Sequence, residues 1–329
     1  MAPQLKARII GTGSFTPQRR MTNADFEKLV DTSDEWITSR TGIKERRIAD
    51  DDTATSDMAV QACQRALDMA GCAKEEIDLL ILGTVTPDYR LPSTACVVQE
   101  KMGLPNAAAF DVVAACTGFI NGLSIANSFI KAGIHKKILA VGVERLSSFT
   151  NYEDRNTCVL FGDAAGAAVV SAEEGDSGIV STFLKSDGRM REFLWSKVGG
   201  TLHPHTPDYT YDGTDKIMMT GSDVFKVAVR EMANASRHVL DQAGIDASDV
   251  TLVIPHQANI RIIEALAKRL KVGMDKVFLN IHKFGNTSSA SVPLALDEAN
   301  REGKFKEGDY VLMVAFGGGL IWGSALVKW

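Results

Sequence analysis

The chain carries a helix–glycine–strand unit twice, and this repeat constrains its fold more than any other feature. The stretch ALDMAGCAKEEIDLLILGT, residues 66–84, aligns with VLDQAGIDASDVTLVIPHQ, residues 239–257. GAAVV (166–170) and GSALV (323–327) match near the ends of the same two halves. One such unit is common enough to arise by chance, but several matches in the same order favour a duplicated α/β half.

The remaining sequence alternates between strand-like and helix-like segments. Short apolar runs predict strands at residues 7–13, 78–85, 108–113, 136–144, 164–171, 249–255, 277–281, 309–316 and 322–329. Helical patterns occupy residues 54–71, 93–102, 118–133, 222–243, 259–271 and 289–303. We therefore expect an α/β fold with one half near residues 1–171 and the other near 222–329. Residues 172–221, rich in Gly, Asp, Thr, His and Pro, are predicted to connect them.

Composition excludes several classes of protein. With 45% hydrophobic and 23% charged residues, the chain resembles an ordinary soluble globular protein. A net charge of −5 argues against a general nucleic-acid or membrane-surface role. The five cysteines form no C-x-x-C pair, which argues against a zinc ribbon or a disulfide framework and favours a reducing cytoplasm. The longest uncharged run, residues 311–327, is interrupted by glycines and predicts two strands, not a membrane helix.

One cysteine lies between a predicted strand and a predicted helix. FDVVAACTGF, residues 110–119, places Cys116 at that point. The N–H groups at a helix start favour negative charge, and the thiolate is the reactive form of cysteine. Free cysteines are also often simply buried, so this motif alone leaves a structural and a reactive role open.

Two further polar groups follow predicted strands. His256 follows a strand in IPHQAN, and Asn286 lies in HKFGNTSSAS beyond the predicted strand 277–281. Ligands of parallel α/β sheets bind at the carboxyl ends of the strands. A histidine there can also cap a helix, and GNTSS can be only a turn, but Cys, His and Asn together indicate a functional site.

A Cys/His/Asn set fits two kinds of chemistry. In a cysteine hydrolase, histidine deprotonates the thiol and asparagine orients the histidine. In a condensing enzyme, cysteine holds an acyl group while histidine and asparagine donate hydrogen bonds to a second thioester and stabilise its enolate. Composition does not decide between them.

Six motifs together resemble one family. TSDEWITSRTGIKERR, DVVAACTGF, FGDAAGAAV, IPHQAN, HKFGNTSSASVP and AFGGGLIWGSALV occur in order between about residue 6 and residue 329. They resemble β-ketoacyl-acyl carrier protein synthase III, an initiating condensing enzyme of fatty-acid synthesis in the thiolase superfamily. The resemblance implies a duplicated, thiolase-like five-layer α/β/α/β/α fold and a homodimer.

The resemblance also implies residue roles. Cys116 corresponds to the acyl-accepting nucleophile. His256 and Asn286 correspond to the pair that binds the malonyl thioester carbonyl and promotes decarboxylation. The N–H of Gly318 would join that of Cys116 in the oxyanion hole, and Phe316 would lie beside the malonyl carboxylate.

Coenzyme A contacts and an acyl-pocket gate follow in the same way. Trp36 and Arg155 resemble the pair that sandwiches the adenine, and Arg40 would lie by the phosphates; flat faces and positive charge suit both tasks. Leu91 resembles the residue that enters the partner subunit's acyl pocket and limits primer length.

A basic patch is expected to receive the acidic carrier protein. Arg261 and Lys268 are seven residues apart and share a helix face, with Arg269 beside them. Lys226 joins them by its position in the family motif. A solvated face balanced by Glu264 is the simpler alternative.

The implied substrates are an acyl-CoA primer and malonyl-acyl carrier protein. No metal or redox cofactor is implied, and His203 and His205 with Asp208 are interpreted as a polar loop. A thioesterase with the same three residues and a related condensing enzyme of secondary metabolism remain alternatives.

Overall fold

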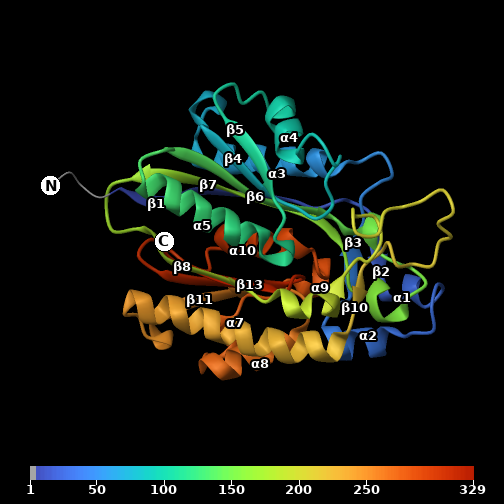
Figure 1. Ribbon diagram of the computed structural model, residues 1–329. Helices are drawn as coiled ribbons and strands as arrows, with labels where there is room; N and C mark the ends of the chain where they lie inside the picture. The colour runs from blue at the N-terminus through green and yellow to red at the C-terminus, as the bar shows by residue number, and fades with distance from the viewer. Residues whose placement is uncertain (1–4) are drawn as a thin grey trace.

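The first of two sheets has five strands. The computed structural model describes residues 5–329, and Figure 1 shows the sheets stacked with helices outside and between them. The first sheet has the order β1 (Lys6–Phe15), β7 (Asp163–Glu173), β6 (Lys137–Arg145), β4 (Leu79–Gly83) and β5 (Ala108–Val112). The strands β6, β4 and β5 are parallel, whereas β7 is antiparallel to both β6 and β1.

The second sheet repeats this arrangement with four strands. Its order is β11 (Val250–Pro255), β12 (Tyr310–Gly317), β13 (Ile321–Lys328) and β8 (Gly178–Ser186). The pair β11 and β12 is parallel, and β13 is antiparallel to β12 and to β8. The strands β8, β13, β12 and β11 therefore correspond to β1, β7, β6 and β4.

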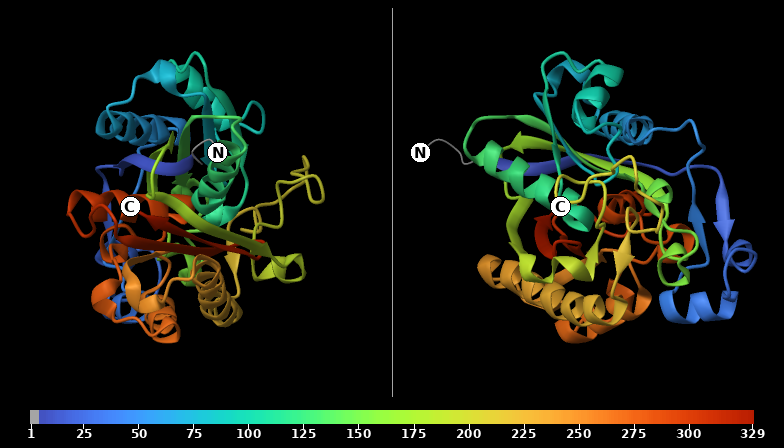
Figure 2. Two further views of the ribbon diagram at one scale, coloured as in Figure 1. Left: turned by 90° about the vertical axis from the view of Figure 1, so that its left-hand side faces the viewer. Right: turned by 45° about the vertical axis from the view of Figure 1, so that its right-hand side comes forward.

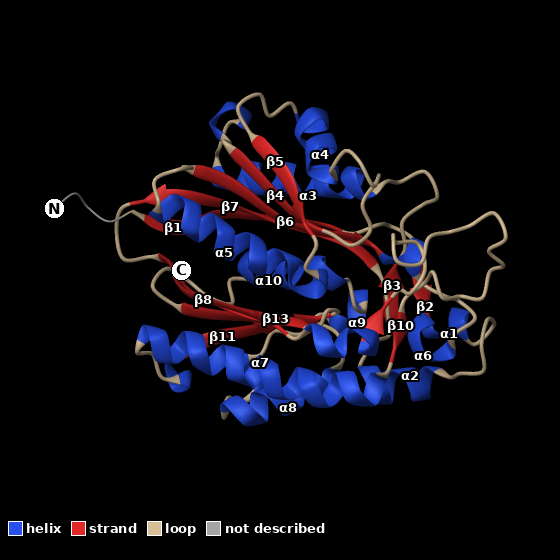
Figure 3. Cartoon of the chain, viewed as in Figure 1, coloured by secondary structure: helices blue, strands red, loops and turns tan. Residues whose placement is uncertain are grey.

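Helices complete the five layers (Figures 1 and 3). The helices are α3 (Thr55–Ala70) and α4 (Thr94–Met102) outside the first sheet, α5 (Gly118–Lys131) and α10 (Ser291–Arg301) between the sheets, and α7 (Gly221–Ala243) and α8 (Ile260–Leu270) outside the second. The central apolar cluster joins both sheets to α5 and α10, and two further clusters lie under the outer helices. The predicted five-layer α/β/α/β/α fold is confirmed.

The prediction of a strand at residues 277–281 is wrong. Only Val277 forms a bridge, to Val253 of β11, and α9 (Ile281–Phe284) begins four residues later. The buried side chain of Gln257 explains the difference: its amide donates to Phe278 O at 3.0 Å and accepts from the N–H groups of Asn280 and Ile281. A side chain thus takes the backbone groups that a neighbouring strand would use.

The expected connecting region contains more structure than its composition suggested. Strand β8 lies within it and pairs along the whole of β13. Because β8 is an edge strand with several exposed residues, it lacks the apolar run that marked the other strands. The short strands β9 (Leu194–Trp195) and β10 (Met218–Met219) pair with each other further along.

A smaller unit lies beside the carboxyl ends of the parallel strands, and Figure 2 shows it from a second direction. Its elements are β2 (Arg20–Thr22), α1 (Asn23–Phe26), α2 (Asp34–Thr41), β3 (Glu45–Arg47) and α6 (Arg155–Cys158). All of these elements except β3 contribute to one apolar cluster. The N-cap of α2 is Ser33, whose hydroxyl accepts from Trp36 N–H, and the helix ends at Gly42 with φ +81°.

Short 3-10 turns complete the chain. They lie at Lys74–Glu76, Ala115–Thr117, Leu146–Phe149, Gly188–Phe193, Ala247–Asp249, Met274–Lys276 and Ser288–Ala290. Among the helices in residues 5–329, none combines the length and the hydropathy needed to cross a bilayer.

Candidate active site

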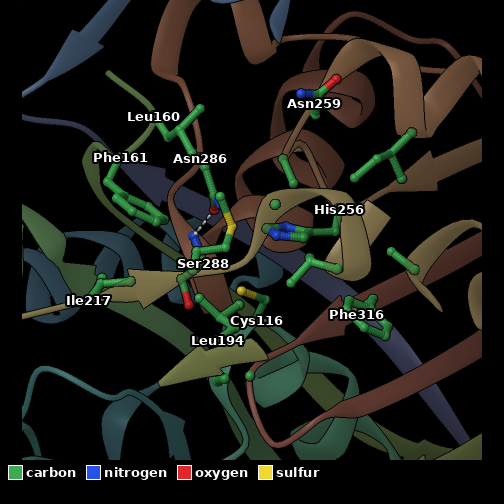
Figure 4. Close-up of a pocket in the computed structure, with 18 of the residues that line it drawn as sticks. Cys116, Leu160, Phe161, Leu194, Ile217, His256, Asn259, Asn286, Ser288 and Phe316 are labelled. Atoms are coloured by element: carbon green, nitrogen blue, oxygen red, sulfur yellow. Dashed lines mark hydrogen bonds between the residues drawn. The ribbon is translucent and has the colours of Figure 1, made fainter. Parts of the chain in front are cut away.

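The three predicted site residues line one cavity of about 1130 Å³. Cys116 follows β5, His256 follows β11, and Asn286 lies between α9 and α10. Figure 4 shows their side chains facing the same space, with Phe316 in its wall. The duplicated fold thus brings together residues that are up to 170 positions apart, from 116 to 286.

Close backbone packing fixes Cys116. It lies in the 3-10 turn Ala115–Thr117, which leads directly into α5. A Cβ on Gly317 of β12 would lie 2.7 Å from the backbone nitrogen of Cys116, and a Cβ on Gly118 would lie 2.9 Å from the Cα of Gly83. Glycine at these positions lets β12 and β4 approach the nucleophile turn.

Burial opposes the thiolate that the start of the helix was expected to favour. Cys116 is only 8% exposed, and burial raises the pKa of its thiol to about 12. The Ser288 side chain opposes this increase by hydrogen bonding, while the charge of Glu144 adds to it. The resting nucleophile is therefore a thiol, and acylation requires a group that accepts its proton.

His256 is a neutral imidazole. Its backbone N–H donates to Val314 O at 2.8 Å, which holds it at the end of β11. The side chain is 3% exposed, and burial lowers its pKa to about 4. At neutral pH it therefore keeps one N–H donor and one acceptor. Its buried Nδ1 has no hydrogen-bond partner within residues 5–329.

The Asn286 amide is held in one orientation. Its Oδ1 accepts from Ser288 N–H at 2.9 Å (Figure 4). Its backbone N–H donates to Leu160 O at 2.9 Å, and its carbonyl accepts from Gly162 N–H at 3.0 Å. Because Oδ1 is engaged, the amide NH₂ group remains to donate to a ligand.

Phe316 and Gly318 both line the cavity. Phe316, in β12, stacks on Trp322 with the planes 16° apart and is almost fully buried. Gly318 follows β12 directly. This side of the cavity is therefore apolar apart from backbone groups.

The residues expected to bind coenzyme A meet beside the cavity, which Trp36 and Arg40 line. The guanidinium carbons of Arg155 and Arg40 lie 4.7 and 4.9 Å from the centroid of the Trp36 ring. Arg155 also pairs with Asp31 at 3.5 Å. The Arg155 guanidinium thus lies over the Trp36 ring, and no open gap separates the two side chains.

The predicted basic patch lies on α7 and α8, which pack side by side. Arg261, Lys268 and Arg269 are exposed on α8, and Lys226 is exposed on α7, 3.6 Å from Asp223. Arg261 donates to Ser39 O at 3.2 Å and lines the cavity mouth. The structure adds Arg237, whose guanidinium donates to Arg269 O at 2.7 Å.

Leu91 does not line the cavity of its own chain. Its side chain is 88% exposed, in the loop before α4. Val113, just beyond β5, does line the cavity and is itself 81% exposed. The cavity therefore reaches the surface near the free edge of β5 as well as at Trp36.

Sequence reasoning missed two buried residues beside the nucleophile, Ser288 and Glu144. Ser288 lines the cavity, and Glu144 at the end of β6 is fully buried behind it. The HKFGNTSSAS motif contained Ser288, but its hydroxyl was indistinguishable from that of a turn serine. Nothing in KKILAVGVE distinguished Glu144 from an exposed strand terminus.

The histidine-rich loop carries no cluster of ligands. His205 lies 3.8 Å from Asp215 and stacks edge-on against Tyr209. Within residues 5–329, no group of three His, Cys, Asp or Glu side chains has the arrangement of a metal site.

Comparison with known proteins extends the match to the whole chain. The synthase III of Caldanaerobacter subterraneus subsp. tengcongensis is 51% identical over 329 residues, which cover 100% of this chain and 99% of the relative. The crystal structure of 3-oxoacyl-[acyl-carrier-protein] synthase III from Aquifex aeolicus has 51% identity and a TM-score of 0.91 over 98% of this chain and 100% of the other. The priming β-ketosynthase of the R1128 polyketide pathway has 36% identity and a TM-score of 0.91, over 99% and 98%.

The two family domains match the two regions of the chain that carry the three cavity residues. The 3-oxoacyl-[acyl-carrier-protein (ACP)] synthase III domain matches residues 110–188, which contain Cys116, and its C-terminal companion matches residues 240–329, which contain His256 and Asn286. With full-length relatives at about half identity, the chain belongs to the β-ketoacyl-[acyl-carrier-protein] synthase III family.

Proposed function

We propose that this protein condenses an acyl-CoA primer with malonyl-acyl carrier protein through an acyl-Cys116 intermediate, with loss of CO₂. The reaction initiates fatty-acid synthesis. The observation that supports it most is the convergence of Cys116, His256 and Asn286 on one cavity whose mouth carries Trp36 and Arg40. Membership of the synthase III family supports the same reaction.

The first half-reaction transfers the acyl group to sulfur. Cys116 loses its proton and attacks the thioester carbonyl, a carbon–sulfur bond forms, and coenzyme A leaves as its thiolate. The N–H groups of Cys116 and Gly318 stabilise the negative oxygen of the tetrahedral intermediate. Trp36 and Arg155 bind the adenine once Arg155 has moved, and Arg40 lies by the phosphates.

The second half-reaction forms the carbon–carbon bond. His256 and Asn286 donate hydrogen bonds to the malonyl thioester carbonyl, and the enolate they stabilise forms as CO₂ leaves. A neutral imidazole and an oriented amide NH₂ suit this donation. Phe316 solvates the malonyl carboxylate poorly and favours its loss. The carbanion then attacks the acyl-Cys116 carbonyl.

The carrier protein docks on the basic patch, defined here as Lys226, Arg261, Lys268, Arg269 and Arg237. The position of Arg261 at the cavity mouth supports this, because a prosthetic arm that enters there reaches Cys116. Positive charge on a protein of net charge −5 steers an acidic partner to this face.

The active form is a homodimer in which Leu91 closes the partner's acyl pocket. Strand β5 is a free edge of the first sheet, and the cavity opens beside it at Val113. A second copy that pairs along this edge covers Val113 and brings an exposed Leu91 to the opening.

The reaction needs no cofactor and takes place in the cytoplasm. Bond exchange and decarboxylation involve no net redox change, so that acyl-CoA is a substrate and no electron carrier is required. The cysteines are free, as a reducing compartment maintains them.

One experiment separates this function from a Cys/His/Asn thioesterase. Intact-protein mass spectrometry after exposure to a panel of acyl-CoA esters should show one acyl group, mapped to Cys116, that persists until malonyl-acyl carrier protein is added. Release of free acid without the malonyl donor would support the thioesterase. The likeness to the R1128 enzyme favours one further test, with a polyketide carrier protein as acceptor; preference for it would indicate secondary metabolism.

A further inference from the structure

Ser288 is bonded to two groups of the site and lies beside a third. Its backbone N–H donates to Asn286 Oδ1 at 2.9 Å, its hydroxyl donates to Glu144 Oε1 at 3.1 Å, and it lines the cavity together with Cys116. Figure 4 shows it between Asn286 and Cys116. Its φ of +48° is uncommon for serine, so that surrounding contacts hold it in place.

Glu144 forms the far end of this connection. Its side chain is 0% exposed, and its second oxygen, Oε2, accepts from Val85 N–H at 3.0 Å, Thr86 Oγ1 at 2.8 Å and Thr84 Oγ1 at 3.1 Å. These neutral donors suit a carboxylate, and they leave Oε1 to Ser288. The Ser288 hydroxyl therefore links Glu144 Oε1 to the part of the cavity wall that carries the Cys116 thiol.

We propose that Glu144, acting through the Ser288 hydroxyl, receives the proton of Cys116 when the primer acylates it. The thiol proton passes to Ser288 Oγ while the serine proton passes to Glu144 Oε1. The sulfur electron pair forms the bond to the acyl carbon, and the coenzyme A thiolate leaves and takes a proton from solvent. This relay rests on the proposed function.

The other candidate acceptor is less suited. Burial lowers the pKa of His256 to about 4 and raises the pKa of Glu144. A general base works best when its pKa lies near the working pH. His256 faces the cavity from the end of β11, Glu144 lies behind the cavity wall at the end of β6, and Phe316 and Gly317 of β12 contribute no charge. The buried carboxyl is therefore the stronger base, and His256 remains a donor to the malonyl carbonyl.

The relay also closes the catalytic cycle. When the carbanion attacks acyl-Cys116, the carbon–sulfur bond breaks and Cys116 leaves as a thiolate. Glu144 then returns its proton through Ser288 and restores the thiol. Between the two steps Glu144 is neutral, which removes a negative charge from beside the cavity when the malonyl carboxylate enters.

The test is single-turnover acylation of Cys116, followed by intact mass across a range of pH. Glu144→Gln and Ser288→Ala should each acylate about 100-fold more slowly than wild type, a typical general-base contribution. The double variant should be no slower than either single variant, because both break one path. The variant rates should rise more steeply with pH, since hydroxide must replace the base. Malonyl decarboxylation should stay within a few-fold, because Ser288→Ala keeps the N–H that orients Asn286.

Two control variants separate the relay from structural support. Thr84→Val removes a donor to the other oxygen of Glu144 and should acylate within a few-fold of wild type. Ser288→Gly accepts the positive φ without strain and should lose as much as Ser288→Ala. Should Glu144→Gln not fold, the two Ser288 variants decide the question.

Each contrary result has a distinct meaning. Ser288 variants that acylate at the wild-type rate with the wild-type pH profile would overturn the relay alone. An equal loss in Thr84→Val would assign Glu144 a structural role and also overturn it. Wild-type protein that accepts no acyl group from any primer would overturn the proposed function together with the relay.

Discussion

The two halves of the molecule share a strand order but differ at the fifth position. The first half has the full strand β5 beside β4, whereas the second half has only the bridge between Val253 and Val277. Cys116 follows β5 closely, while Asn286 comes after a loop and α9. The first half thus holds the nucleophile at the end of a strand. In the second half the corresponding strand is absent, and a loop with α9 places Asn286 at the cavity instead.

The turns that follow these positions are equivalent but perform different tasks. Each is a 3-10 turn that opens with a positive φ, at Ala115 (+42°) in the first half and Ser288 (+48°) in the second. The next residue is Cys116 in one turn and Ser289 in the other. One backbone design therefore presents a nucleophile in the first half and a structural hydroxyl in the second.

A glycine of the opposite half packs against each turn. A Cβ on Gly317 would lie 2.7 Å from Cys116 N, and a Cβ on Gly142 would lie 2.1 Å from Ser289 O. Ser289 Oγ donates to Gly83 O at 2.8 Å and so ties the turn to β4. The two halves therefore share the backbone geometry of this turn, and the side chain at its second position decides whether the turn carries a nucleophile or a structural hydroxyl.

The largest expected effect comes from truncating the side chains at the two equivalent positions, Cys116 and Ser289, to alanine. Cys116→Ala should abolish acyl-enzyme formation and condensation, because no other side chain offers sulfur at that turn. Ser289→Ala should retain acylation and lose about 1 kcal/mol of unfolding free energy, the usual contribution of a hydrogen bond. Intact mass and thermal unfolding measure the two outcomes. Acylation of Cys63, Cys72, Cys96 or Cys158 in the Cys116 variant would break the comparison.

The next effect separates the half-reactions. His256→Ala and Asn286→Ala should slow malonyl decarboxylation about 100- to 1000-fold, as expected for loss of one donor to a developing negative oxygen. Acylation of Cys116 should fall much less, since the first half carries that step. Release of labelled CO₂ and intact mass measure each step separately. Normal decarboxylation with lost acylation would instead assign both residues to the thiol.

A smaller effect concerns the outer helices of the second half. Arg261→Glu with Lys268→Glu should raise KM for malonyl-acyl carrier protein about tenfold at low salt and less at physiological salt, where charge is screened over about 8 Å. Acylation by acyl-CoA should change little. Glu264→Lys, on the same helix, is the matched control and should lower KM. Equal losses in both half-reactions would point to misfolding or to a coenzyme A contact.

The last expected change is in the pH dependence of stability, and its sign differs between the halves. Burial lowers the pKa of His256 to about 4 in the folded protein, so that stability is lost as pH falls below its ordinary 6.5, by about 2 kcal/mol at pH 5. Burial raises the pKa of Glu144, so that its contribution is lost as pH rises above its ordinary 4.5. The difference in unfolding temperature between variant and wild type, measured from pH 5 to pH 8, should therefore change with pH in opposite directions for His256→Gln and Glu144→Gln. A change in the same direction for both variants would contradict the assignment.

Much of the architecture could be predicted from the sequence, because strands and helices leave periodic patterns of apolar residues. Strongly apolar strands such as β4 and β12 and glycine-terminated helices such as α3 and α7 were predicted within a few residues. Edge strand β8 was missed because four of its nine residues are exposed, and the strand at 277–281 was predicted wrongly because the Gln257 side chain bonds the backbone groups that a neighbouring strand would use.

The site could be predicted from the sequence where its reactive side chains lie within the recognised motifs. Cys116, His256 and Asn286 each follow a strand end, and they do meet in one cavity. The protonation state of the thiol was not readable, because burial arises from the packing of β12 and the 286–290 segment against it. Glu144 and Ser288 were missed for the same reason: they lie 144 residues apart and become neighbours only when the two halves stack.

The buried state of Cys116 has a consequence for covalent inhibitors and for oxidative damage. A thiol whose pKa is about 12 presents almost no thiolate to peroxide or to simple alkylating reagents at neutral pH. Compounds that merely seek reactive sulfur should therefore modify the exposed Cys96 first and leave activity intact. An effective covalent inhibitor must instead imitate the thioester and place an electrophilic carbonyl at the N–H groups of Cys116 and Gly318, where the protein itself removes the proton.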